Sequence, residues 1–98
     1  MGTSNVQTYH QSTSNQNTVK LRELLKTMPP FCRDYFRGIE PTTTAKTRIG
    51  YGYDIRTFFR FILAQNPMFH HVEMTQIRLQ DLEQLQPVDI EEYLEYLK

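Results

Sequence analysis

The sequence predicts a small all-α protein. In several segments apolar residues recur three and four positions apart, which is the period of an amphipathic helix. Prolines and glycines divide these segments into helix-length pieces, and no stretch shows the alternating pattern that is typical of a strand. The 98 residues are enough for one domain with a small core.

The first helix is expected to follow a polar tail. Residues 1–18 are rich in Ser, Thr, Asn and Gln and show no apolar period, which predicts a disordered segment. We therefore expect the folded domain to span residues 19–98. Its first helix is indicated by four apolar residues: Leu21, Leu24, Leu25 and Met28. Pro29 and Pro30 end this helix and form a corner.

A second short helix is predicted after the corner. Its apolar side consists of Phe31, Tyr35, Phe36 and Ile39, and Gly38 and Pro41 close the segment. Cys32 lies in this helix. We interpret it as a half-buried thiol rather than a nucleophile, because no histidine lies nearby in the sequence to activate it.

The longest helical pattern runs from Thr43 to Leu63. Thr44 is the predicted N-cap, because its hydroxyl can accept an otherwise unpaired N–H of the first turn. The stripe expected to be buried contains Ile49, Gly52, Ile55, Phe59 and Ile62, widened by Tyr51, Phe58 and Leu63. The other side presents Lys46, Thr47, Gly50, Tyr53 and Thr57. Asn66 and Pro67 are expected to end the helix.

Each of the two glycines of this helix requires an explanation, because a glycine in a helix interior lowers helix stability by about 1 kcal/mol relative to alanine. For Gly52, close packing of another helix is one of the explanations that stay open. Gly50 lies on the polar side and is better explained by another molecule that approaches the backbone.

The C-terminal third is expected to hold a loop over residues 68–76, one or two helical turns with Leu79, Leu82 and Leu85, and a last helix. Pro87 occupies the predicted first helical position, and Asp89 lies in the first turn, where a carboxylate meets the positive helix end. The apolar stripe of this helix is Ile90, Tyr93, Leu94 and Leu97. Its solvated face is Glu91, Glu92 and Glu95.

The charge of the chain is zero in total but unevenly distributed. Residues 19–60 carry nine basic and four acidic side chains, whereas residues 61–98 carry two basic and seven acidic ones. One half can therefore attract a polyanion, and the other half is better suited to solvent or to a basic protein partner.

Few features indicate catalysis or metal binding. His10 lies in the polar tail, and His70 and His71 form an adjacent pair without a partner at ligand spacing, so we expect no metal site and no cofactor. The single cysteine excludes an internal disulfide, and no apolar stretch is long enough to span a membrane. We therefore expect a cytoplasmic protein without a membrane partner.

Three segments, taken in order, match a known helical pattern. They are LRELLKTMPPFCRDYFRGIE, TAKTRIGYGYDIRTFFRFIL and LQDLEQLQPVDIEEYLEYL, within residues 19–97. Thr47, Tyr51, Asp54, Ile55 and Phe58 reproduce the central pattern T-x-x-x-Y-x-x-D-[IL]-x-x-F. The chain thus resembles the core-binding, SAM-like domain that precedes the catalytic domain of tyrosine recombinases, the phage-integrase and Xer class. The resemblance implies a small orthogonal helical bundle.

The resemblance also implies a role in DNA integration and recombination. Such domains form half of a C-shaped clamp around duplex DNA at the core recombination site. The implied DNA contacts are Thr44, Lys46, Thr47 and Gly50, with Arg48, Tyr53 and Thr57 as neighbours. Tyr51, Ile55 and Phe58 become core positions. The implied partners are double-stranded DNA, a C-terminal catalytic domain, and other recombinase protomers in the full-length protein.

The chain departs from the family pattern in two ways. Nothing in it matches the recombinase arginine pair, lysine, His-x-x-Arg motif or nucleophilic tyrosine, so we expect no enzyme activity from this fragment; Tyr93 and Tyr96 belong to the third-helix pattern. The family's last, basic helix is also expected to be missing, and the apolar area left exposed could drive self-association. A different function stays open, namely a SAM-like module that binds a protein through its acidic C-terminal face.

Overall fold

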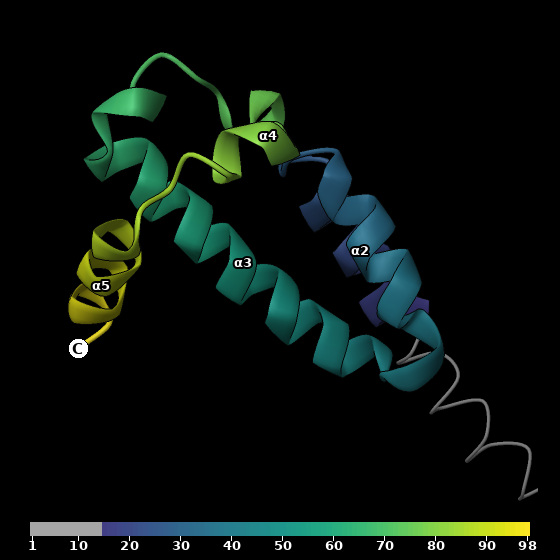
Figure 1. Cartoon of the computed structure of the whole chain (residues 1–98). Coiled ribbons are helices and arrows are strands. Elements are labelled where there is room, and N and C mark those ends of the chain that lie inside the picture. The colour runs from purple at the N-terminus through teal and green to yellow at the C-terminus, as the bar shows by residue number, and fades with distance from the viewer. Residues whose placement is uncertain (1–14) are drawn as a thin grey trace, which may run out of the picture.

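Helices account for every regular element in the described part of the chain, residues 15–98 of a computed structural model, which confirms the predicted all-α class (Figure 1). The first helical segment covers residues 15–25. It is followed by α2 (Phe31–Ile39), η1 (Glu40–Thr42), α3 (Ala45–Gln65), η2 (Pro67–Phe69), η3 (Met74–Gln76), α4 (Leu79–Leu82) and α5 (Pro87–Tyr96), where η denotes a 3-10 turn.

The first helix begins earlier than the sequence predicted. Residues 15–18 are helical, so the prediction of a disordered tail over residues 1–18 is wrong for these four; residues 1–14 lie outside the described part. Once the packed leucines fix the helix, each further residue added at its N-terminal end gains a backbone hydrogen bond for a small entropic cost. Polar residues can therefore continue a helix that their own sequence does not indicate.

The elements are arranged around α3, the longest helix. α2 and α3 meet at η1 and diverge from it, and α5 lies across the C-terminal half of α3 (Figure 1). η2 and η3 contact α3 as well. The first helix and α2 thus lie near the beginning of α3, and α5 lies near its C-terminal end.

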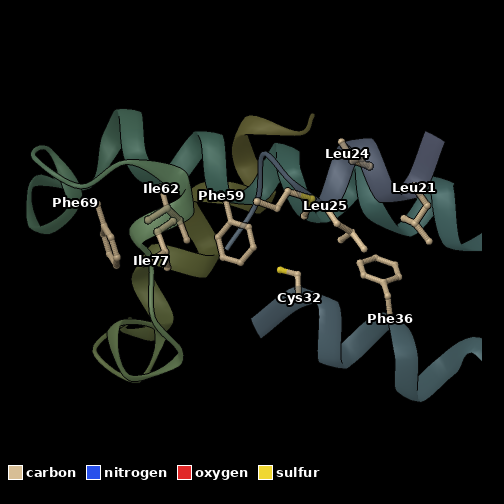
Figure 2. Close-up of a cluster of buried hydrophobic side chains, with 10 residues drawn as sticks. Leu21, Leu24, Leu25, Cys32, Phe36, Phe59, Ile62, Phe69 and Ile77 are labelled. Atoms are coloured by element: carbon tan, nitrogen blue, oxygen red, sulfur yellow. The ribbon is translucent and has the colours of Figure 1, made fainter. Parts of the chain in front are cut away.

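The core is formed by the first helix and the corner after it, by α2 and α3, and by two residues of the segment after α3. Its members are Leu21, Leu24, Leu25, Met28, Cys32, Phe36, Phe59, Ile62, Phe69 and Ile77 (Figure 2). Phe31 of α2 adds an edge-to-face contact with Phe59 of α3, with ring centroids 6.0 Å apart. The prolines after Met28 direct α2 back over the first helix, so that Cys32 and Phe36 meet its leucines (Figure 2).

Gly52 lies where the first helix crosses α3. A Cβ atom at this position would be 2.6 Å from Cδ2 of Leu24 and 3.4 Å from Cδ1 of Leu21. Close helix packing, one of the explanations left open by the sequence, is therefore the one that the structure supports.

Tyr51 is not a core residue, so the expectation drawn from the resemblance is wrong here. Its side chain is 42% exposed, whereas Ile55 and Phe58 are partly buried against the core. Tyr51 precedes Gly52 by one residue, which turns it about 100° away from the face that the first helix covers. No described element covers this other face at the level of Tyr51.

The last helix buries only one side of its apolar stripe. Tyr93 contacts Phe58 and Phe61 of α3, with ring centroids 4.9 and 5.3 Å apart. Ile90, Leu94 and Leu97 remain exposed. α5 is therefore attached to the outer side of α3 by an aromatic contact and leaves an apolar strip open.

Candidate nucleic-acid interface

The start of α3 is fixed by the predicted N-cap. Oγ1 of Thr44 accepts a hydrogen bond from the backbone N–H of Thr47 at 3.1 Å and donates one to Oγ1 of Thr47 at 2.9 Å. The cap satisfies one of the amide groups that a helix leaves unpaired at its beginning. Both threonines are exposed, so this end of α3 is open to solvent.

Four of the predicted contact residues share one exposed face of α3. Lys46, Gly50, Tyr53 and Thr57 are spaced four, three and four residues apart, and we call them the Lys46 stripe. Nothing lies within 4 Å of the position that a Cβ atom on Gly50 would take. Lys46 makes no hydrogen bond or ion pair with any residue between 15 and 98.

The C-terminal part of the Lys46 stripe combines an aromatic ring with a second cation. The guanidinium of Arg56 lies 5.2 Å from the ring centroid of Tyr53, which is 49% exposed. The hydroxyl of Thr57 donates to the carbonyl oxygen of Tyr53 at 2.9 Å. The stripe therefore offers one free ammonium group, a stretch of bare backbone and a ring held beside a guanidinium group.

Arg48 does not belong to this face. It is separated from Gly50 by two residues, or about 200° around the helix, and points toward the connection before α3. Its Nη1 donates to the carbonyl oxygens of Thr43 at 2.6 Å and Glu40 at 3.1 Å, and to Oγ1 of Thr43 at 3.1 Å. Arg48 thus holds the turn between α2 and α3, where carbonyl groups at a helix end attract a cation.

A groove of about 500 Å³ lies between the first helix, α2 and the start of α3, and we call it the basic groove. Its basic residues are Arg22, Lys26, Arg33, Arg37 and Arg48, and its apolar floor contains Leu21, Leu25 and Phe36. Lys26 pairs with Glu23 at 3.0 Å. The side chains of Arg22, Arg33 and Arg37 form no hydrogen bond or ion pair within the described chain.

In the sequence these basic residues contribute to the charge of residues 19–60 but indicate no common site. Arg22 and Lys26 are four residues apart on one helix, and Arg33 and Arg37 are four apart on the next. This spacing indicates a basic face on each helix. Only the proline corner, which turns α2 back along the first helix, makes the two faces border one groove.

Among residues 15–98, the side chains that could react show no sign of activation. Burial raises the pKa of the Cys32 thiol to about 11, which fits a packing role. Burial, with Asp54 and Tyr96 nearby, also raises the pKa of Tyr93. His70 and His71 are exposed, and no group of three or more His, Cys, Asp or Glu residues in the described chain could hold a metal ion.

No helix between residues 15 and 98 is long and apolar enough to cross a lipid bilayer. The fold and the candidate interface define a small helical protein with a basic groove and a mixed polar stripe at one end and an acidic helix at the other. Comparisons of the chain with protein-family models, with curated proteins and with solved structures found no match. The likeness to recombinase domains thus depends on the motif residues of the sequence.

Proposed function

We propose that this chain is the DNA-binding, SAM-like core-binding domain of a site-specific tyrosine recombinase. It grips duplex DNA at the core recombination site, and a separate catalytic domain carries out strand cleavage. The motif residues of three successive segments support the family, and the uneven charge distribution supports DNA as the ligand.

The Lys46 stripe is the observation that carries the proposal. A lysine without an internal partner can neutralise a phosphate, and the open backbone at Gly50 permits a close approach that a side chain would prevent. Thr44 and Thr47 add hydroxyl groups and the amide groups of a helix start, which also favour anions. Arg48 is engaged with the turn before α3, and it contributes to binding by holding that turn in place.

Binding of a short DNA duplex, followed by fluorescence anisotropy at low salt, tests this proposal. We expect Lys46→Ala to weaken binding by about threefold to tenfold, because one phosphate contact is lost. Lys98→Ala removes a lysine beside the acidic helix and is the matched control, expected to bind like the parent chain. Equal affinities for both variants would contradict the assigned face.

Chemical shift perturbation locates the interface independently. Amide signals of Lys46, Thr47 and Gly50 should move during a DNA titration, while those of Glu91 and Glu92 in α5 should stay constant. Movement confined to other residues would refute the site, and no movement at all at low salt would refute DNA binding by this domain.

Protein binding through α5 is a second candidate function. It is favoured by the exposed side chains of Ile90, Leu94 and Leu97 beside the carboxylates of this helix. A basic protein partner would then bind without DNA. Loss of that binding on replacement of Glu91, Glu92 and Glu95 by glutamine would support it, and unchanged binding would refute it.

A further inference from the structure

Arg56 is a cation of α3 that the predicted contact residues do not include. It lies three residues after Tyr53, so it borders the Lys46 stripe about 60° around the helix. Its guanidinium carbon Cζ lies 5.2 Å from the centroid of the Tyr53 ring. Its side chain forms no hydrogen bond or ion pair with any residue between 15 and 98. The N–H donors of this guanidinium group are therefore available to a ligand.

The ring of Tyr53 restricts the region that this guanidinium group occupies. An arginine side chain on a helix surface has many rotamers, and a ligand that fixes one of them loses affinity to the entropy of the others. The face of an aromatic ring attracts a guanidinium group and keeps it beside the stripe before any ligand binds. The ring is 49% exposed, so the guanidinium group is held at the surface of the molecule.

The position of Arg56 complements that of Lys46. The two cations are ten residues apart, or about 15 Å along α3 at 1.5 Å per residue. The major groove of B-DNA is about 12 Å wide, so cations at this separation can reach phosphates on both of its sides. Between them lie the bare backbone of Gly50 and the ring of Tyr53, which carry no charge. The arrangement fits a duplex with one phosphate backbone near each cation.

We propose that Arg56 contacts a DNA phosphate and that Tyr53 is a positioning residue, which holds the guanidinium group of Arg56 at the interface. The face of the ring performs this role, and the phenolic hydroxyl does not take part. The expected role of Tyr53 thereby changes from direct contact with DNA to support of a neighbouring contact. This inference rests on the proposed function and extends its interface to a second cation of α3.

A double-mutant cycle, followed by fluorescence anisotropy with the duplex used for Lys46→Ala, tests the coupling. Arg56→Ala should weaken DNA binding by about threefold to tenfold and make the salt dependence shallower by about one. Tyr53→Leu should weaken binding by about twofold to fivefold, although it removes no charge. Tyr53→Phe keeps the ring face and should bind like the parent chain. The double variant Tyr53→Leu with Arg56→Ala should bind like Arg56→Ala alone, because the missing ring has nothing left to position.

Three outcomes would overturn the proposal. They are an Arg56→Ala variant with the affinity and salt dependence of the parent chain, a Tyr53→Phe variant that binds as weakly as Tyr53→Leu, and a double variant in which the two losses add. Circular dichroism shows that each variant is folded, and Tyr53→Met replaces Tyr53→Leu if it is not. A loss of affinity in Lys46→Ala without one in Arg56→Ala would refute this inference alone, whereas a parent chain that binds no duplex would refute the proposed function as well.

Discussion

The two glycines of α3 are only two residues apart, yet their surroundings differ. A Cβ atom on Gly52 would meet the buried side chain of Leu24 at 2.6 Å, whereas nothing lies within 4 Å of one on Gly50. Helix propensity favours alanine at both positions. Packing opposes alanine only at Gly52.

Alanine substitutions should therefore have opposite effects on stability. We expect Gly50→Ala to raise the free energy of unfolding by about 0.5 to 1 kcal/mol. Gly52→Ala should lower it by about 1 kcal/mol, because overpacking exceeds the gain in propensity. Urea denaturation followed by circular dichroism measures both. A stabilising Gly52→Ala would show that Leu24 moves freely, and the close packing would then have no energetic role.

Gly50→Ala also separates stability from binding. If DNA approaches the bare backbone at this position, the more stable variant should bind DNA about threefold to tenfold more weakly, since a methyl group holds the phosphate chain away. Anisotropy with the duplex used for Lys46→Ala measures this effect. Unchanged affinity would leave Gly50 without a role in contact and would restrict the interface to the first turn of α3.

At the scale of the element, α4 and α5 begin in the same way. Oδ2 of Asp81 accepts the backbone N–H of Arg78 at 2.8 Å, and Oδ2 of Asp89 accepts that of Gln86 at 2.7 Å. Each carboxylate lies in the first turn, where the helix dipole favours negative charge. A helix of only four residues such as α4 depends strongly on this bond.

The beginning of α4 should be sensitive to acid. Backbone and side-chain hydrogen bonds from Arg78 lower the pKa of Asp81 from its ordinary value of 3.8. A carboxyl group whose pKa is lower in the folded than in the unfolded state stabilises the fold fully at pH values above the unfolded-state pKa. This contribution is lost as the pH falls through the folded-state pKa. We therefore expect Asp81→Asn to reduce stability at neutral pH and to make no difference in strong acid. Urea titrations at several pH values measure the free energy of unfolding of the parent chain and of the variant. A difference between the two that does not change with pH would refute the prediction.

At the scale of the whole molecule, the two ends of α3 carry opposite charge. The basic groove and the Lys46 stripe lie toward its beginning, and Glu91, Glu92 and Glu95 lie on the helix packed near its end. A net charge of zero therefore does not describe what a ligand meets at either end. A polyanion is attracted to one end and repelled by the other, which also orients it.

DNA binding should consequently depend on salt even though the net charge is zero. We expect the logarithm of the affinity to fall linearly with the logarithm of salt concentration, with a slope of about −0.9 for each phosphate neutralised. Lys46→Ala should make the slope shallower by about one. Glu92→Gln at the acidic end should leave the slope unchanged. A flat response of the parent chain would show that phosphate contacts do not dominate.

Several elements followed from local sequence. Thr44 as N-cap, Asn66 and Pro67 after the end of α3, and Pro87 at the start of α5 are confirmed, because caps and prolines act within one helical turn. The core leucines of the first helix were also predicted correctly. These features need no knowledge of distant residues.

Other features depended on neighbours far away in the sequence. Phe69 and Ile77 are buried core residues, although the predicted loop over residues 68–76 shows no helical period. Phe69 lies in the 3-10 turn η2 and Ile77 directly follows η3, and both turns contact α3. Arg48 points toward the turn before α3, since carbonyl groups of that turn attract it. Of the predicted contact residues, four form the Lys46 stripe. Thr44 caps α3 and is hydrogen-bonded to Thr47, whereas Arg48 lies on another side of the helix.

The helical class, most helix ends and the division of charge could be predicted from the sequence, because periodicity, capping and composition are local or additive properties. The packing role of Gly52, the exposure of Tyr51 and the common groove of two basic faces became evident in the folded structure alone. The folded structure also showed that the apolar strip of α5 lies uncovered in the described chain. The physical reason is that burial at a position depends on which element crosses there, and crossing is set by contacts between segments far apart in the chain.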